Sequence, residues 1–407
     1  MSGKWPGGFI KKTAPTVVGP VDGEGGSASG IWTLDQAADY EQRGLWPMPT
    51  LSRGLYAWGQ NADGPLGLGD TVDRSSPVQV GTLTTWDQPA SGNYFSLATK
   101  TDGTLWAWGL NSYGNLGLSN TTSYSSPVQI GIYTTWSKVT AGENHTIAVK
   151  TDGTLWAWGD NAQGQLGLGF TTPATRTSPT QVGSLTNWLD TASAGQYNLA
   201  TKTDGTLWAW GVNGQGQLGL GNTTYRSSPI QVGALTTWVN IACGLGHSIA
   251  TQTNGTLWTW GYNDKGPLGL GDTTSRSSPV QVGALTTWLN VAGGLYSTYA
   301  TKTDGTLWAW GIGTSGELGD GATVDKSSPI QVGALTNWSK VGASRNGGLA
   351  ITTTGTLYAW GYNGNGQLGQ GNTTPTSSPV QVGALTTWNV LSKNYGGSRS
   401  TLVTTKG

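Results

Sequence analysis

Residues 297–311 have the sequence STYATKTDGTLWAWG, in which two runs of strand-forming residues flank Asp304 and Gly305. An Asp-Gly pair between such runs favours a two-residue type I′ turn, in which both central residues have positive φ. The same pair occurs at residues 102–103, 152–153 and 204–205, and Asn254-Gly255 is its equivalent. The stretch therefore predicts a β-hairpin that recurs along the chain.

An internal repeat dominates the 407 residues. The dipeptide Trp-Gly recurs at intervals of 50 residues, with one interval of 52, and begins at Trp58, Trp108, Trp158, Trp210, Trp260, Trp310 and Trp360. A second tryptophan, which ends the string LTTW or a close variant, follows the same spacing. The pattern predicts seven units of about 50 residues over residues 51–407. The two extra residues lie between Gly169 and Pro179 and are interpreted as a loop insertion.

The string TLWAWG predicts how the units pack on one another. Trp106 and Trp108 lie two residues apart and point to one face of a strand, whereas Leu105, Ala107 and Gly109 point to the other. A strand with one large and one small face can stack on its own copy. With about four short strands per unit and no helix, this pattern predicts an all-β, seven-bladed β-propeller.

The tryptophans of the Trp-Gly dipeptides have two interpretations. They fill the core between blades, or they form an exposed platform that stacks on sugar rings. Tyr56 and Tyr358 replace the residue equivalent to Trp106 in the first and last units, which preserves an aromatic volume and favours the core. The predicted structural core residues are Trp58, Trp108, Trp158, Trp210, Trp260, Trp310 and Trp360.

The two ends of the repeat region predict how the ring closes. The first unit begins at Leu55 without the strand and turn that precede every later copy. Residues 400–407, STLVTTKG, match that missing strand and stop at the turn glycine. We therefore expect one blade to combine strands from both ends, which covers two otherwise open strand edges.

The repeat also resembles a known family. Residues 141–169, AGENHTIAVKTDGTLWAWGDNAQGQLGLG, are similar to the repeats of the regulator of chromosome condensation family, and the resemblance extends over residues 51–407. It implies a seven-bladed propeller, a fold that serves exchange factors, ligase subunits and interaction modules. The best-known member acts on a small GTPase through additions to its propeller faces. The units here are nearly identical and no basic tail is present, so nucleotide exchange and chromatin binding are not expected.

Residues 1–50 form a second predicted module. Residues 1–30 are rich in Gly, Pro and Ser and predict an extended arm. Thr33 and Gln36 fit a capping box for a short helix that ends near Arg43.

The string GGSASGIWTLDQAADYEQRGLWP in this module resembles a terminal segment of bacteriophage virion proteins, especially tail and fibre-like proteins. The resemblance implies anchoring to other virion proteins. The alternative interpretation is an ordinary short capped helix. The candidate anchoring residues are Trp32, Leu34, Tyr40 and Trp46.

The composition excludes several classes of function. Lys+Arg and Asp+Glu are both 21, the formal net charge is zero and 10% of the residues are charged, which argues against a nucleic-acid or anionic-membrane binder. The sequence contains no apolar run of about 18 residues, so membrane insertion is not predicted. The start of the chain does not predict a signal peptide, and the single cysteine, Cys243, cannot form an intrachain disulfide.

No motif predicts catalysis, a cofactor or a metal. His145 and His247 occupy a repeat position that holds Phe95 and Ser297 in other units, and Cys243 occupies a small-residue position, so packing roles are predicted. The loop carboxylates, among them Asp70, Asp272 and Asp320, are separate from one another. The G-x-G-x-x-G strings beginning at residues 214 and 364 lack the strand-turn-helix context of a dinucleotide site.

These observations predict a non-enzymatic structural protein of a bacteriophage virion, made in the host cytoplasm and associated with the tail or the surface. The propeller would serve protein interaction, or bind a host-surface glycan or protein through its polar loops. The alternative is a bacterial or cellular propeller that acts as a protein–protein interaction module. A glycan-cleaving enzyme is least supported, because glycoside hydrolysis needs two placed carboxylates.

Overall fold

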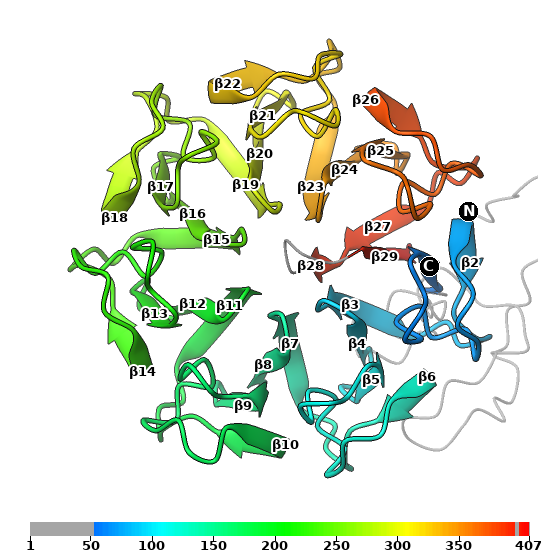
Figure 1. Ribbon diagram of the computed structural model, residues 1–407, viewed down its shortest axis with the longest axis vertical. Helices are drawn as coiled ribbons and strands as arrows, with labels where there is room; N and C mark the ends of the chain where they lie inside the picture. The colour runs from blue at the N-terminus through cyan, green and yellow to red at the C-terminus, as the bar shows by residue number, and fades with distance from the viewer. Residues whose placement is uncertain (1–52, 395–398, 407) are drawn as a thin grey trace, which may run out of the picture. The chain divides into compact units, whose positions relative to one another are not determined.

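The computed structural model describes residues 53–394 and 399–406, whose strands form seven sheets arranged as blades around a central axis (Figure 1). Every regular element in these residues is a strand, which confirms the predicted all-β, seven-bladed propeller. No helix able to cross a membrane is found in this part of the chain. The predicted arm, residues 1–50, lies outside the described residues, and so do its capped helix and Trp32, Leu34, Tyr40 and Trp46.

Six blades are built from consecutive antiparallel strands. Blade 1 contains β3 (Trp86–Ser91), β4 (Phe95–Lys100), β5 (Leu105–Gly109) and β6 (Tyr124–Gln129). Blade 2 contains β7 (Trp136–Ala141), β8 (His145–Lys150), β9 (Leu155–Asp160) and β10 (Thr175–Gln181). Blade 3 contains β11 (Trp188–Ala194), β12 (Tyr197–Lys202), β13 (Leu207–Gly211) and β14 (Arg226–Gln231).

Blades 4 to 6 repeat this arrangement, with the first strand of each blade facing the central axis (Figure 1). Blade 4 contains β15 (Trp238–Cys243), β16 (His247–Gln252), β17 (Leu257–Gly261) and β18 (Arg276–Gln281). Blade 5 contains β19 (Trp288–Gly293), β20 (Ser297–Lys302), β21 (Leu307–Gly311) and β22 (Lys326–Gln331). Blade 6 contains β23 (Trp338–Ser344), β24 (Gly347–Thr352), β25 (Leu357–Gly361) and β26 (Thr376–Gln381).

Blade 7 combines strands from distant parts of the sequence. Its order is β2 (Arg74–Gln79), β1 (Leu55–Gly59), β29 (Ser400–Thr405) and β27 (Trp388–Leu391). Leu55 of β1 pairs with Thr404 of β29, and Gly59 pairs with Ser400. The short strand β28 (Lys393–Asn394) pairs in parallel with β3, so backbone hydrogen bonding continues from the end of blade 7 into blade 1.

The hairpin turns differ from the predicted type I′ geometry. At the turn after β4, the Gly103 N–H donates to the Lys100 carbonyl at 2.9 Å, and the Lys100 N–H donates to the Thr104 carbonyl at 2.9 Å. Gly103 has φ +78°, but Asp102 is not among the described residues with positive φ. This is a type I turn followed by a left-handed glycine, so the predicted turn type is wrong. The cause is local, because Asp102 Oδ1 accepts from the Thr104 N–H and hydroxyl.

The tryptophans of the Trp-Gly dipeptides join neighbouring blades. All seven are fully buried, and each indole N–H donates to a backbone carbonyl of the adjacent blade. Trp108, for example, donates to the Pro65 carbonyl at 2.8 Å. Gly67 lies against the same indole, since a Cβ on Gly67 would lie 2.7 Å from Trp108 Nε1. Side chains without exposed surface cannot form a sugar-stacking platform.

Deleting residues 400–407 should destabilise the whole ring, because β29 lies between β1 and β27 and its loss leaves both strand edges unpaired. We expect a clearly lower melting temperature or aggregation, measured by calorimetry and light scattering. Deleting residues 406–407 alone is the matched control, since it leaves β29 intact. Equal melting of the longer truncation and the full chain would contradict the structural role of β29.

Candidate interaction surfaces

The propeller has two distinct faces. The turn face carries the hairpin turns and the crossover loops between blades, which are joined by hydrogen bonds such as Trp136 N–H to the Gly103 carbonyl at 3.0 Å. The long-loop face carries the Gly-rich loops between the third and fourth strands and the short loops between the first and second strands. These two sets are joined by bonds such as Leu110 N–H to the Tyr94 carbonyl at 2.9 Å.

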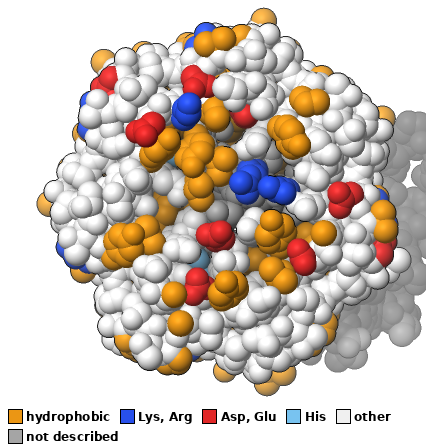
Figure 2. Space-filling view, viewed as in Figure 1, with side chains coloured by type: hydrophobic (Ala, Val, Ile, Leu, Met, Phe, Trp, Pro, Cys, Tyr) orange, Lys and Arg blue, Asp and Glu red, His pale blue; other side chains and the backbone are white. Residues whose placement is uncertain are grey.

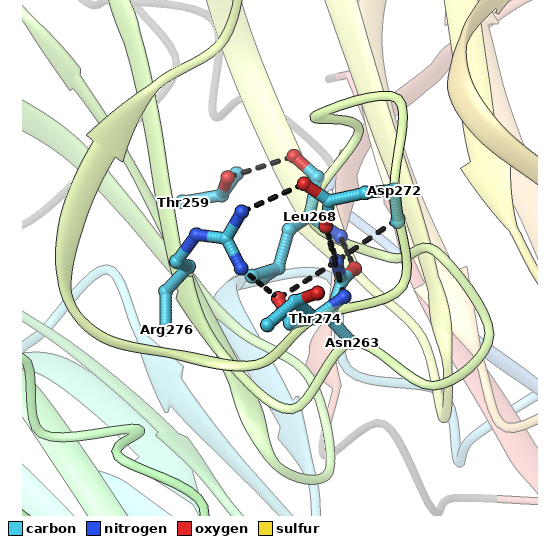
Figure 3. Close-up of polar contacts among 6 residues, drawn as sticks. All are labelled: Thr259, Asn263, Leu268, Asp272, Thr274 and Arg276. Carbon is cyan, nitrogen blue, oxygen red and sulfur yellow. Dashed lines mark hydrogen bonds and ion pairs between the residues drawn. The ribbon is translucent and has the colours of Figure 1, made fainter.

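Polar groups within the long loop of blade 4 close this loop on itself (Figure 3). In blade 4, the Asn263 side-chain amide donates to the Asp272 carbonyl at 3.0 Å and to the Thr274 carbonyl at 3.1 Å. Asn263 Oδ1 accepts from the Leu268 N–H at 3.0 Å. Arg276 binds the Asp272 carboxylate at 2.7 Å. The loop is therefore held by internal contacts before any ligand binds.

The loop carboxylates Asp70 and Asp272 are engaged within their own loops. The Thr274 N–H bond to Asp272 holds the pKa of that carboxyl below its usual 3.8, with Arg276 as a further contribution. Asp70 is bound in the same way by the Val72 N–H and by Arg74. No group of three His, Cys, Asp or Glu side chains that could hold a metal occurs in residues 53–394 and 399–406.

The short loops at the centre of the long-loop face form a chain of backbone hydrogen bonds between blades. The Glu143 N–H donates to the Gly195 carbonyl at 2.8 Å, and the Leu295 N–H donates to the Arg345 carbonyl at 3.1 Å. The backbone repeats, but no two of blades 1 to 6 carry the same two-residue combination at this place: Asn93-Tyr94, Glu143-Asn144, Gly195-Gln196, Leu245-Gly246, Leu295-Tyr296 and Arg345-Asn346.

One region of this surface is aromatic. Tyr296 of blade 5 packs against Tyr262 of blade 4, with ring centroids 5.0 Å apart and an interplanar angle of 41°. Both rings are partly exposed, as are Leu245 and Leu295. Figure 2 shows hydrophobic side chains gathered around the central hollow of one propeller face, next to a few acidic and basic ones. The sequence prediction missed this tyrosine pair, although both residues occupy positions that vary from blade to blade.

The central channel contains a cavity of about 410 Å³ lined by the innermost strands. Polar side chains here join neighbouring blades. The Asn240 amide donates to the Leu289 carbonyl at 2.7 Å, the Asn290 amide donates to the Ser339 carbonyl at 3.0 Å, and Lys340 Nζ donates to Asn389 Oδ1 at 2.9 Å. These polar side chains of the channel lining therefore stabilise the contacts between neighbouring blades.

The turn face carries a regular ring of apolar side chains. Each crossover loop presents a large apolar side chain that is between 40% and 53% exposed, and the loop after blade 1 adds Ile132, which is 89% exposed. The seven equivalent side chains are Leu83, Tyr133, Leu185, Leu235, Leu285, Leu335 and Leu385. Because six of the seven are leucine at the same repeat position, this ring looks nearly the same from each blade.

His145 and His247 are fully buried and make single side-chain contacts. His145 Nε2 lies 2.8 Å from Asn198 Oδ1, and His247 Nε2 lies 2.9 Å from the Thr298 hydroxyl. Burial lowers the pKa of His145 from 6.5 to about 4 and that of His247 to about 3. Both imidazoles are therefore neutral at pH 7. Cys243 is also buried.

The seven repeat units match a known family model. A family model described as the regulator of chromosome condensation (RCC1) repeat matches residues 54–99, 102–149, 152–201, 204–251, 254–301, 304–351 and 354–403. The chain belongs to the RCC1 repeat family. A second RCC1 repeat model matches residues 136–165, 238–266 and 338–367. A comparison with curated proteins gave no match.

Solved structures share the fold of this RCC1 propeller. Prp20p from Saccharomyces cerevisiae is 20% identical with a TM-score of 0.78, over 88% of this chain and 92% of that one. Human WBSCR16 is 20% identical with a TM-score of 0.78, over 87% of this chain and 99% of that one. Yeast RCC1 (Prp20) bound by Kap60 is 21% identical with a TM-score of 0.75, over 88% and 90%. At these identities the likeness shows the fold alone.

Lowering the pH should destabilise the propeller over a pH range that the pKa values of its two buried histidines define. Their unfolded pKa is near 6.5 and their folded pKa is about 4 and 3, so stability present above pH 6.5 is lost as the pH falls toward these values. One pKa unit corresponds to about 1.4 kcal/mol, so the full loss per histidine is on the order of 3–5 kcal/mol. Urea unfolding at pH 7.5 and 4.5 measures it.

The double variant His145→Phe and His247→Ser is the matched comparison, because Phe95 and Ser297 occupy the same position in blades 1 and 5. Its stability should change less between pH 7.5 and 4.5 than that of the natural chain. An unchanged pH slope would show that other groups cause the acid sensitivity.

Proposed function

We propose that this RCC1 propeller is a protein-interaction module that binds its partner across the long-loop face. The observation that carries the proposal is the variation of partly exposed side chains around the centre of this face, on a backbone that repeats from blade to blade. The partly exposed Tyr262–Tyr296 pair is its largest aromatic feature. The proposal includes no catalytic step.

The symmetry of the ring supports this choice of face. A surface that repeats in each blade offers a single asymmetric partner several equivalent positions, so it cannot select one orientation. The turn-face leucines repeat in this way. The short loops of the long-loop face carry a different two-residue combination in each of blades 1 to 6, and they include apolar Leu295 and Tyr296 as well as charged Glu143 and Arg345. Such differences specify one binding orientation, and tyrosine is enriched among residues that dominate binding energy.

Relatives provide a further reason to consider protein partners. Prp20p is described together with its binding to Gsp1p and histones, and yeast RCC1 (Prp20) has been solved bound to Kap60. These are properties of those proteins. For this chain they support the class of function, protein binding, and the identity of the partner is left to experiment.

The double variant Tyr262→Gln and Tyr296→Gln should weaken partner binding by about tenfold or more, as loss of a central aromatic anchor does. Gln60 and Gln196 occupy the equivalent positions in other blades, so the variant should fold. Partners are identified by cross-linking and mass spectrometry in the source cell and then measured by calorimetry with the purified partner. Leu285→Gln on the turn face is the control. If both variants lose affinity for the partner equally, or if neither loses affinity, the long-loop face is excluded as the binding surface.

A virion role is a second candidate function, favoured by the resemblance of residues 25–47 to a terminal segment of bacteriophage virion proteins, especially tail and fibre-like proteins. In this reading residues 1–50 bind other virion proteins, and the propeller is displayed to a host-surface protein or glycan. Residues 1–50 fused to an unrelated domain should then be incorporated into purified phage particles, whereas residues 51–407 alone should not. Incorporation of residues 51–407 at full-length levels would refute anchoring through the arm.

A further inference from the structure

Four blades hold a lysine ammonium group on two indole rings near the turn face. Lys202 Nζ lies 3.5 Å from the ring centroid of Trp208 and 4.7 Å from that of Trp188. The equivalent lysines of blades 1, 2 and 5 lie 3.7, 3.9 and 3.6 Å from the equivalent of Trp208. Since these lysines are also buried, the negative faces of the indoles stabilise each cation.

Blade 4 keeps both indoles but lacks the cation. Trp238 and Trp258 have centroids 6.1 Å apart at 78°, the same values as the blade 5 pair, which holds a lysine. Gln252 replaces the lysine, and Asn254 replaces the aspartate of the adjoining turn. The positive and the negative residue are thus both absent, which leaves a neutral aromatic pair. Blades 6 and 7 also lack the lysine, but there a tyrosine replaces one tryptophan, and tryptophan binds cations best.

Gln252 occupies the position of the lysine but forms only one long side-chain hydrogen bond there. Its side chain is buried, with 8% of its surface exposed, yet its Nε2 has no hydrogen-bond partner. Its Oε1 accepts one long bond from the Thr256 hydroxyl, at 3.4 Å. An unpaired buried amide is unfavourable, so a group that displaces the Gln252 amide breaks only one long hydrogen bond.

A groove leads to this pair from solvent. A cavity of about 540 Å³ between blades 3 and 4 is lined by Leu235, Trp238 and Trp258, and Trp258 is partly exposed. Gln252 does not line this cavity, so a ligand that enters it meets the indoles first and must displace Gln252 to lie between them. Arg226 is the one charged residue among those that line the cavity.

We propose that the Trp238–Trp258 pair of blade 4 binds the lysine side chain of a partner protein. The occupant is indicated by the molecule itself, because four equivalent indole pairs already hold a lysine. The alkyl stem packs along the apolar groove near Leu235, and the ammonium group takes the place of the Gln252 amide between the rings. The indole pair lies near the turn face, and its groove extends to residues 219–222 of the blade 3 long loop. It shares no residue with the Tyr262–Tyr296 surface, so either proposal can fail without the other.

The test is an NMR titration of the full chain labelled with 15N in its tryptophan indoles, with Nα-acetyl-lysine amide as the probe. The indole signals of Trp238 and Trp258 should shift and saturate. Nα-acetyl-norleucine amide has the same stem without the charge and should leave them nearly unmoved. A response to norleucine as large as the response to lysine, or no lysine response, overturns the proposal.

Two variants introduce into one blade the residues that another blade carries at the same repeat position. Gln252→Lys supplies an internal cation to blade 4 and should abolish the response of Trp238 and Trp258. The double variant Lys202→Gln and Asp204→Asn gives blade 3 the residues of blade 4 and should create a second response, at Trp208. Persistence of the response in Gln252→Lys, or its absence at Trp208 in a folded double variant, contradicts the assigned site.

Discussion

The buried indole of each Trp-Gly dipeptide is the contact on which the propeller depends. Its N–H donates to a main-chain carbonyl in the long loop of the adjacent blade, as from Trp108 to Pro65 or from Trp158 to Asn115. A buried indole N–H without an acceptor would be costly, so this bond sets the position of one blade on the next. Because the acceptor is backbone, the residue that supplies it can vary without loss of the contact.

This contact explains why glycine is so frequent in the long loops. Gly117 has φ +72°, and a Cβ on it would lie 2.8 Å from Trp158 Nε1. Only glycine combines the left-handed backbone with contact this close to the ring. The loop can therefore vary only at positions that point away from the indole. Those positions are where Tyr262 and its equivalents lie, and they supply the proposed interaction surface.

The sequence predicted the strands and blades well and the turn and surface detail less well. Strand faces follow from alternation, so TLWAWG identified which residues face a neighbouring blade. The turn type was wrong because Asp102 Oδ1 binds Thr104, a side-chain bond that the Asp-Gly pattern does not reveal. The Tyr262–Tyr296 pair was missed because the two residues belong to different blades and meet only in the closed ring.

The sequence by itself determined the number of blades and the hydrophobic faces of the strands, because seven near-identical units with period-two alternation are compatible with few other arrangements. It also contained the departures from the repeat at Gln252 and Tyr296. The tertiary structure decided what those departures mean. Lys202 meets both Trp188 and Trp208 only because β12 lies between the strands that carry them, and this pairing shows which group Gln252 replaces. Such contacts depend on strand pairing and ring closure, which local sequence patterns do not specify.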